Sequence, residues 1–199
     1  MSHHDAEENK VSPKVCFVTI GATAAFDTLI RACFKPDFLK ELSKQGYECL
    51  QVQYGRDGKI LFDQLVAQVP NKEELGLLFD GFDFDADGLT DYFVHARESE
   101  GVVISHAGSG TILDVMRISA ALVVVPNPEL LDNHQVELAA ELARQGYVVH
   151  GNLDNLVNAI TDAEAVKQRR KQWPPVNSDV SQRANPLADV MEEEMGYLD

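Results

Sequence analysis

Basic residues are scarce in this sequence. Lys and Arg number 17 against 32 Asp and Glu, which gives a formal net charge of −15 at pH 7. A polyanion such as nucleic acid, or an anionic lipid surface, requires positive charge over a large area of its partner. The composition therefore argues against nucleic acid as a partner and against direct binding to an anionic membrane.

Long hydrophobic runs and a cysteine framework are also missing. The longest apolar runs, such as residues 120–126, are far shorter than the roughly 20 residues of a membrane-spanning helix. The first ten residues are polar and lack the apolar core of a secretory signal. Cys16, Cys33 and Cys49 form no C-x-x-C pair, so we expect packed thiols in a reducing compartment and a cytoplasmic chain without a membrane span.

Several cofactor and catalytic motifs are absent. The sequence has no G-x-x-x-x-G-K-[ST] phosphate loop, no G-x-S-x-G nucleophile elbow and no H-E-x-x-H zinc pair. Residues 108–110 begin like a dinucleotide fingerprint, but Leu113 occupies the position of its third glycine. We therefore expect no bound cofactor.

Residues 83–88 read D-F-D-A-D-G and open like an EF-hand calcium loop. Val94 stands at position 12 of that loop, where a bidentate glutamate is needed. The same carboxylates would suit the D-x-D metal clamp of some transferases, although D-x-D is a weak signal in so acidic a chain. The pattern favours a solvated loop, and we expect no metal site.

Short strands alternate with helices along most of the chain. The pattern predicts strands at residues 15–20, 47–54, 75–79, 102–104, 122–125 and 147–149, and helices at 26–34, 37–45, 60–69, 89–98, from 109, 133–145 and 153–171. This order predicts a doubly wound, Rossmann-like α/β domain with a parallel sheet covered on both faces. We assign residues 14–172 to this domain and residues 1–13 to a flexible lead-in.

Residues 173–199 form a separate C-terminal segment that begins with Trp173-Pro174-Pro175. Further along, four apolar side chains fall on one face of an acidic helix: Leu187, Val190, Met191 and Met195. This face either folds back on the core of the chain or docks on a partner.

The stretch from Gly101 to Thr111 predicts an anion site. It reads G-V-V-I-S-H-A-G-S-G-T and leads from a buried strand into a helix that carries Asp114. Small residues allow close approach of the backbone, and the free N–H groups at the start of the helix attract a phosphate. The alternative is an ordinary helix start, because Thr111 and Asp114 have the spacing of a capping box.

A second polar loop follows the next strand, at residues 126–135. In a parallel sheet this loop emerges at the same carboxyl edge as the anion site, where open α/β sheets bind ligands. Asp132-Asn133-His134-Gln135 places four hydrogen-bonding side chains in one turn, which suits a sugar. Asp132 and Gln135 also fit a capping box, which is the structural alternative.

In this order, the loops resemble the carboxyl-terminal, donor-binding half of the family 28 glycosyltransferases, to which the bacterial MurG enzyme belongs. The matching motifs are a G-x-T turn after the first strand, S-H-A-G-S-G-T-I-L-D at residues 105–114, and V-P-N-P-x-L-x-D-N-H-Q at residues 125–135. V-T-I-G-A-T at 18–23 and Q-Y-G-R at 53–56 are similar to the small cytosolic subunit of two-part eukaryotic enzymes of this family. The resemblance covers residues 14–160 and implies the donor-binding half of a GT-B glycosyltransferase.

The resemblance implies a site for UDP-GlcNAc. It assigns the ribose to Asp114, although MurG-type enzymes usually carry a longer glutamate there, and the sugar to His134 and Gln135, beside Asn133. The backbone near Phe82 and Phe84 would face the uracil. The residues that would hold the diphosphate are Gly21, Ala22, Thr23, Gly108, Ser109, Gly110 and Thr111.

The implied reaction is a single inverting displacement, in which an acceptor hydroxyl attacks the anomeric carbon as UDP leaves. Helix N-termini would stabilise the leaving group in place of a metal. His106 is a candidate catalytic base, or a residue that only orients the phosphate loop.

The resemblance further implies a second polypeptide, because whole enzymes of this family have another domain that binds the lipid acceptor. For the two-part enzymes this is a membrane-anchored subunit at the cytosolic face of the endoplasmic reticulum, and the acceptor is GlcNAc-diphosphodolichol. Two alternatives stay open: a subunit of a split exopolysaccharide transferase with another donor, and a nucleotide-sugar-binding module without catalysis.

Overall fold

The computed structural model describes residues 12–21, 25–128 and 133–172, with only the backbone at 133–135, 170 and 172. The chain divides into two compact units, Met1–Lys167 and Gln168–Asp199. The α/β fold belongs to the first unit, and of the second only residues 168–172 are described. The C-terminal face predicted at Leu187 to Met195 therefore lies outside the described residues.

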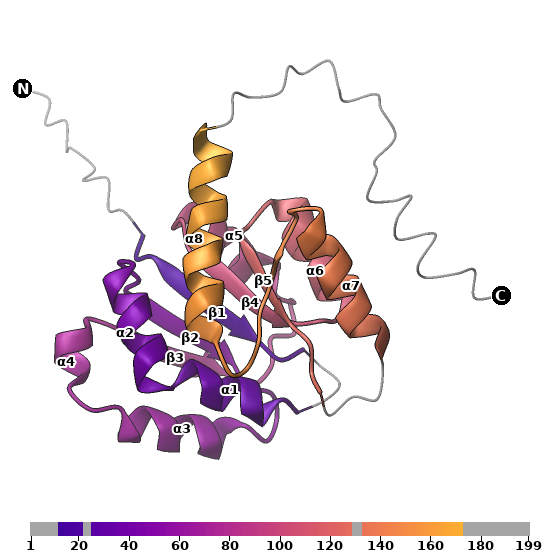
Figure 1. Ribbon diagram of the computed structural model, residues 1–199. Coiled ribbons are helices and arrows are strands. Elements are labelled where there is room, and N and C mark those ends of the chain that lie inside the picture. The colour runs from indigo at the N-terminus through magenta and orange to yellow at the C-terminus, as the bar shows by residue number, and fades with distance from the viewer. Residues whose placement is uncertain (1–11, 22–24, 129–132, 173–199) are drawn as a thin grey trace, which may run out of the picture. The chain divides into compact units, whose positions relative to one another are not determined.

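The centre of the first unit is a six-stranded sheet in the order β3-β2-β1-β4-β5-β6 (Figure 1). Every pair of neighbouring strands is parallel. The strands are β1 (Val15–Thr19), β2 (Cys49–Gln53), β3 (Leu78–Phe82), β4 (Val102–His106), β5 (Leu122–Val125) and β6 (Val149–His150). This order reverses between β1 and β4, as in doubly wound nucleotide-binding folds, and it confirms the predicted fold class.

Helices α1 (Asp27–Cys33), α2 (Pro36–Lys44), α3 (Lys59–Gln68) and α8 (Leu156–Gln172) pack on one face of the sheet. Apolar side chains from these helices, such as Ile30, Leu39 and Ile160, form one core cluster with Val18 and Ile104 of the strands. Helix α4 (Lys72–Leu75) is a single turn that packs beside α2.

The other face is covered by helices α5 (Thr90–Glu98), α6 (Ser109–Ile118) and α7 (Asn133–Arg144). Phe17 of β1 is fully buried there against the rings of Tyr92 and Phe93. Because both faces of β1 and β4 are covered, these strands are buried at nearly every position, as in parallel sheets generally.

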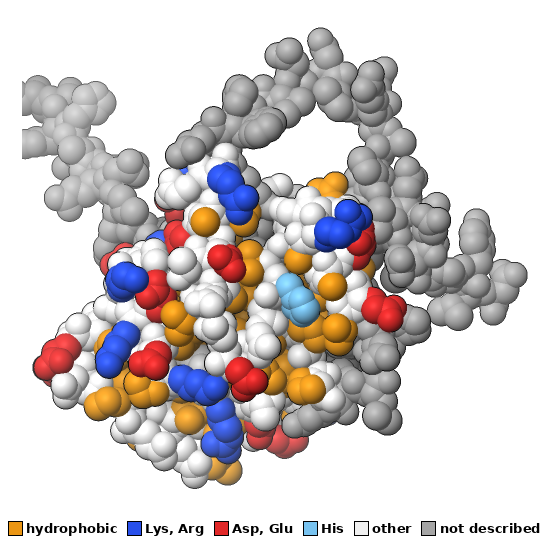
Figure 2. Space-filling view, in the orientation of Figure 1, with side chains coloured by type: hydrophobic (Ala, Val, Ile, Leu, Met, Phe, Trp, Pro, Cys, Tyr) orange, Lys and Arg blue, Asp and Glu red, His pale blue; other side chains and the backbone are white. Residues whose placement is uncertain are grey.

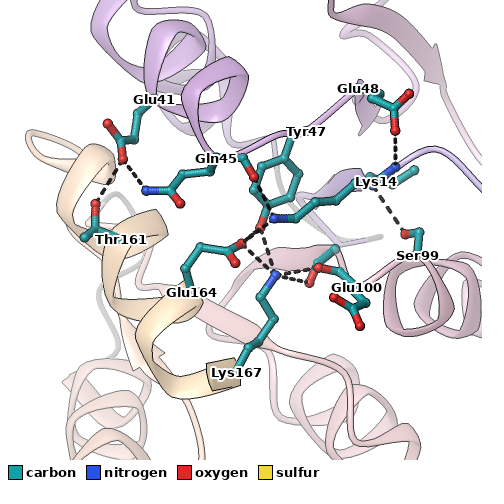
Figure 3. A network of polar contacts seen from close by, with 12 residues as sticks. Lys14, Glu41, Gln45, Tyr47, Glu48, Ser99, Glu100, Thr161, Glu164 and Lys167 are labelled. Carbon is teal, nitrogen blue, oxygen red and sulfur yellow. Dashed lines mark hydrogen bonds and ion pairs between the residues drawn. The ribbon is translucent and has the colours of Figure 1, made fainter. Parts of the chain in front are cut away.

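A polar network ties α8 to the amino ends of the strands (Figure 3). The Glu164 carboxylate accepts a hydrogen bond from the Tyr47 hydroxyl at 2.6 Å and pairs with Lys14 at 3.1 Å and Lys167 at 2.6 Å. Lys167 also donates to the backbone carbonyls of Glu100 and Gly101. The network lies at the edge of the sheet opposite to the predicted anion site.

The predicted elements need two corrections. The strand expected at residues 75–79 is wrong by three positions, because Leu75 closes the turn of α4, Gly76 follows in a left-handed conformation, and β3 runs from Leu78 to Phe82. Pairing with β2 holds Asp80 and Gly81 in this edge strand despite their low strand propensity. The strand expected to end at Ile104 continues to His106, so that this histidine belongs to β4.

Within the described ranges, no helix has the length and apolar character needed to span a bilayer.

Candidate nucleotide-sugar site

The predicted anion site lies where the chain leaves β1 and β4. These strands are neighbours, with Thr19 of β1 beside Ser105 of β4, so the turns that follow them meet at the carboxyl edge of the sheet. Gly21 follows β1 with a φ of 79°, a conformation that favours glycine. Ala22 and Thr23 lie outside the described residues.

His106 packs against both glycine turns. A Cβ atom added to Gly21 would lie 2.3 Å from Cε1 of His106, and one added to Gly108 would lie 2.3 Å from its Nε2. The imidazole therefore fills the space that any side chain at either glycine would require. The two turns and the last residue of β4 form one packed unit.

The environment of His106 keeps its side chain neutral. Burial lowers the pKa of His106 below its ordinary value, because desolvation disfavours the charged ring. Its Nδ1 atom is buried and, among the described residues, has no hydrogen-bond partner. The His106 side chain therefore packs between the two turns, and it is neutral there.

The start of α6 offers free backbone donors beside these turns. Gly108 is the N-cap residue, no side chain caps the helix, and the first helical hydrogen bond runs from the Ile112 N–H to the Gly108 carbonyl. The N–H groups of Ser109, Gly110 and Thr111 therefore have no partner within the helix. Such a helix start attracts a phosphate group.

The capping-box alternative at Thr111 and Asp114 is wrong, because Thr111 lies inside the first turn of α6 and Gly108 is the N-cap. Asp114 is exposed and pairs with Arg117 at 3.4 Å. The Asp114 carboxylate remains accessible to a ligand from the surface of the helix.

Gln53, the last residue of β2 and the first of the Q-Y-G-R motif, connects the turn after β1 with the loop after β3. It was not predicted as a site residue. Its buried side-chain carbonyl accepts a hydrogen bond from the Thr19 hydroxyl at 2.7 Å. Its amide nitrogen donates to the backbone carbonyls of Gly21 at 3.3 Å and Asp83 at 3.1 Å. The signal in the sequence was a polar residue at the end of each of two strands, Thr19 and Gln53.

The loop after β5 meets the same edge. Asn127 is buried and donates from its side-chain amide to the backbone carbonyl of Ala25 at 3.5 Å, which joins this loop to the segment after β1. Asn133, His134 and Gln135 lie in the first turn of α7, and only their backbone is described. Asp132, with its predicted capping role, lies outside the described residues.

The segment proposed to face the uracil has several backbone groups already paired. The Phe82 carbonyl accepts from the Tyr54 N–H at 2.9 Å, and the Phe84 N–H donates to the Asp83 carboxylate at 2.7 Å. The Phe82 ring stacks on Tyr92 at 4.5 Å, whereas the Phe84 side chain is exposed.

Carboxylates of residues 83–88 stabilise their own loop. Asp85 accepts hydrogen bonds from the Asp87 N–H and from the Tyr92 hydroxyl, both at 2.9 Å. Burial and the bond to Asp85 raise the pKa of Tyr92 to about 12. Where the chain is described, no group of three or more His, Cys, Asp or Glu residues could hold a metal ion.

Known proteins are similar to this chain over most of its length. The model of the glycosyltransferase family 28 C-terminal domain matches residues 15–192. The UDP-N-acetylglucosamine transferase subunit ALG13 of Yarrowia lipolytica is 34% identical over 149 residues, which cover 74% of this chain and 70% of that protein.

Two solved structures share the fold. An NMR structure of ALG13 has a TM-score of 0.63 and 27% identity, and covers 91% of this chain and 96% of its own. MurG of Acinetobacter baumannii has a TM-score of 0.56 and 18% identity, and the match covers 91% of this chain and 50% of MurG. Since the family model spans nearly the whole chain, the chain belongs to the glycosyltransferase family 28 C-terminal domain family, and it has the α/β fold of a GT-B glycosyltransferase.

Proposed function

We propose that this chain is the donor-binding subunit of an inverting transferase that moves GlcNAc from UDP-GlcNAc to GlcNAc-diphosphodolichol. The observation that carries the proposal is the unit of Gly21, His106 and Gly108 beside the open start of α6. The similarity to proteins named UDP-N-acetylglucosamine transferase subunit supports the choice of donor.

The diphosphate would lie against the backbone N–H groups of Ser109, Gly110 and Thr111, opposite the turn that contains Gly21, Ala22 and Thr23. Gly110 leaves room for the phosphates, because a Cβ atom at this position would meet nothing within 4 Å. The positive end of the α6 dipole would stabilise the charge that develops on UDP as it leaves.

The order of the loops along the carboxyl edge suggests where the ribose, the sugar and the uracil of the donor would bind. Asp114, one turn further along α6, would accept hydrogen bonds from the ribose. Asn133, His134 and Gln135 at the start of α7 would contact the sugar. The backbone near Phe82 and Phe84 would face the uracil.

The acceptor hydroxyl of GlcNAc-diphosphodolichol would attack the anomeric carbon and give a β1,4 linkage. His106 is neutral but packed between two backbone turns, and its Nδ1 atom is buried. We therefore infer that His106 positions the diphosphate turns and that the general base belongs to the partner subunit. This partner would be membrane-anchored and would hold the chain at the cytosolic face of the endoplasmic reticulum.

The test is transfer of labelled GlcNAc from UDP-GlcNAc to GlcNAc-diphosphodolichol. The purified chain is compared with the chain added to membranes depleted of their own subunit. We expect activity only with membranes, because the acceptor site and the base are completed there. Activity of the chain alone would contradict the assignment of the base to a partner.

The same assay separates the alternatives. Transfer of glucose or glucuronate in preference to GlcNAc would indicate an exopolysaccharide transferase subunit. A chain that binds UDP but supports no transfer with any donor would indicate a nucleotide-sugar-binding module. The variant Gln135→Ala should weaken both donor binding and transfer in a true donor subunit.

A further inference from the structure

An apolar groove lies on the side of the fold away from the donor edge. It has a volume of about 560 Å³ and is formed by α2, the end of α3 and the turn of α4. Helix α2 leads into the amino end of β2, and residues 69–75 lead into the amino end of β3. The groove therefore opens near the amino ends of these strands, whereas the proposed diphosphate site lies at their carboxyl ends.

The floor of the groove is apolar and its walls are polar. Phe34, Leu39 and Val69 form the buried part of the floor, with Leu65 and Leu75 half-buried beside them. Lys40 and Lys44 stand exposed on the wall from α2, and Asn71 and Glu74 on the wall from α4. In Figure 2, basic and acidic side chains both lie over α2, and an acidic side chain lies near α4.

The two charged residues of α2 that line the groove are both basic, on a strongly acidic protein. Lys40 and Lys44 are one helical turn apart and line the same groove. Lys44 pairs with Glu41 at 3.1 Å, but within the described ranges Lys40 has no ion-pair partner. For a chain with a net charge of −15, this wall is a local site for carboxylates of a partner.

We propose that this groove docks an amphipathic helix of the partner subunit, with its apolar side chains on the floor and its carboxylates facing Lys40 and Lys44. The proposal rests on the proposed function for the identity of the partner, which is taken to be the acceptor-binding subunit. It adds the surface and the chemistry of the partner segment.

The shape of the polar lining favours a helix over a small molecule. A small-molecule site has a few polar groups that converge on one point. Here they are spread along two facing walls, and the α2 wall from Pro36 to Lys44 is about 12 Å long at 1.5 Å per residue. That length accommodates about two turns of a helix with apolar anchors at i, i+3 or i+4, and i+7.

Cross-linking tests the occupant directly. A photoreactive p-benzoylphenylalanine replaces Ser43, which lines the groove, in the full-length chain expressed in eukaryotic cells that lack their own subunit. Mass spectrometry should identify an adduct with a helical segment of another polypeptide that carries Asp or Glu on one side. The same photoreactive residue at the exposed Lys59, which does not line the groove, should not give this adduct.

Charge reversal tests the recognition. The double variant Lys40→Glu/Lys44→Glu should lower the adduct yield and the membrane-dependent transfer by about tenfold, which corresponds to about 1.4 kcal/mol. Binding of UDP by the variant should stay unchanged, which shows that it is folded. Lys59→Glu is the matched control and should change neither quantity.

Several results would overturn the proposal. An adduct with residues 173–199 of the same chain, with a second copy of the chain, or only with lipid would each do so. The absence of any adduct from a chain that binds UDP would do so as well. Full transfer by Lys40→Glu/Lys44→Glu would also overturn it. If the wild-type chain forms the adduct but neither binds UDP nor supports transfer, the proposed function is wrong. The groove would then still be a docking site for a partner helix.

Discussion

The imidazole ring of His106 leaves no room for a side chain at Gly21 or Gly108. The Cβ of an alanine at position 108 would lie 2.3 Å from Nε2 of His106, so the ring or the turn would have to move. We expect Gly108→Ala to lower the free energy of unfolding by about 1–3 kcal/mol, the usual cost of overpacking. Urea unfolding of the purified chain measures this loss.

Gly110→Ala is the matched control for stability, because a Cβ at position 110 would meet nothing within 4 Å. In the first turn of α6 this change should be neutral or stabilise the chain by up to about 1 kcal/mol. In a His106→Ala background the cost of Gly108→Ala should disappear. A cost that persists there would show that the ring is not the obstacle.

His106 also predicts a dependence of stability on pH. Burial lowers its pKa in the folded chain, so below the ordinary value of about 6.5 the unfolded chain binds more protons than the folded one. The free energy of unfolding should therefore fall as the pH decreases from about 7.5 to 5.5. Urea unfolding at several pH values should show a smaller fall for His106→Gln, and identical slopes would contradict the prediction.

At the scale of elements, α8 is held by its apolar side and by the polar network of Glu164 and Lys167. Leu156, Ile160 and Ala163 are buried in the core, and the Lys167 side chain is only 12% exposed, beside Glu164 at 15% (Figure 3). Hydrogen bonds and ion pairs to Tyr47, Lys14 and Lys167 lower the pKa of Glu164 although burial alone would raise it. The carboxylate is therefore charged and paired in the folded chain.

We expect Lys167→Met to lower the free energy of unfolding by about 1–3 kcal/mol, because it removes the hydrogen bonds from Lys167 to the Glu100 and Gly101 carbonyls and its ion pair with Glu164. Lys59→Met is the control, since the Lys59–Asp63 pair is exposed at 67% and 57% and is worth less than about 1 kcal/mol. Chemical denaturation measures both variants. Equal losses would show that the network does not anchor α8.

At the scale of the whole molecule, a diphosphate that joins the turns after β1 and β4 should stabilise the fold. At a UDP concentration of 100 times Kd, the free energy of unfolding rises by about 2.7 kcal/mol. For a domain of this size the midpoint of thermal unfolding should increase by roughly 5–10 °C. Differential scanning calorimetry measures this shift.

UMP at the same concentration is the control, because it lacks the second phosphate. Its effect should be smaller if the start of α6 binds the diphosphate. Equal shifts with UMP and UDP would mean that the nucleotide is held without this helix start.

The alternation of strands and helices and the glycine-rich stretches could be predicted from local pattern. Periodicity and turn residues are local properties, and they sufficed for the doubly wound fold, for β5 at Leu122–Val125 and for the helix start after Gly108. The order of the motifs also sufficed to recognise the family.

Only the tertiary structure decided which distant residues meet. The position of β3 depends on pairing with β2, which holds Asp80 and Gly81 in a strand against their local preference. The contact of His106 with Gly21 depends on the parallel pairing of β1 and β4, and the bonds of Gln53 to Thr19 and Asp83 depend on the neighbouring strands. The sequence by itself determined the elements and their order, because these follow from contacts between near neighbours in the chain. The packed turns and the groove between α2 and α4 required the fold, because they join residues that local pattern does not connect.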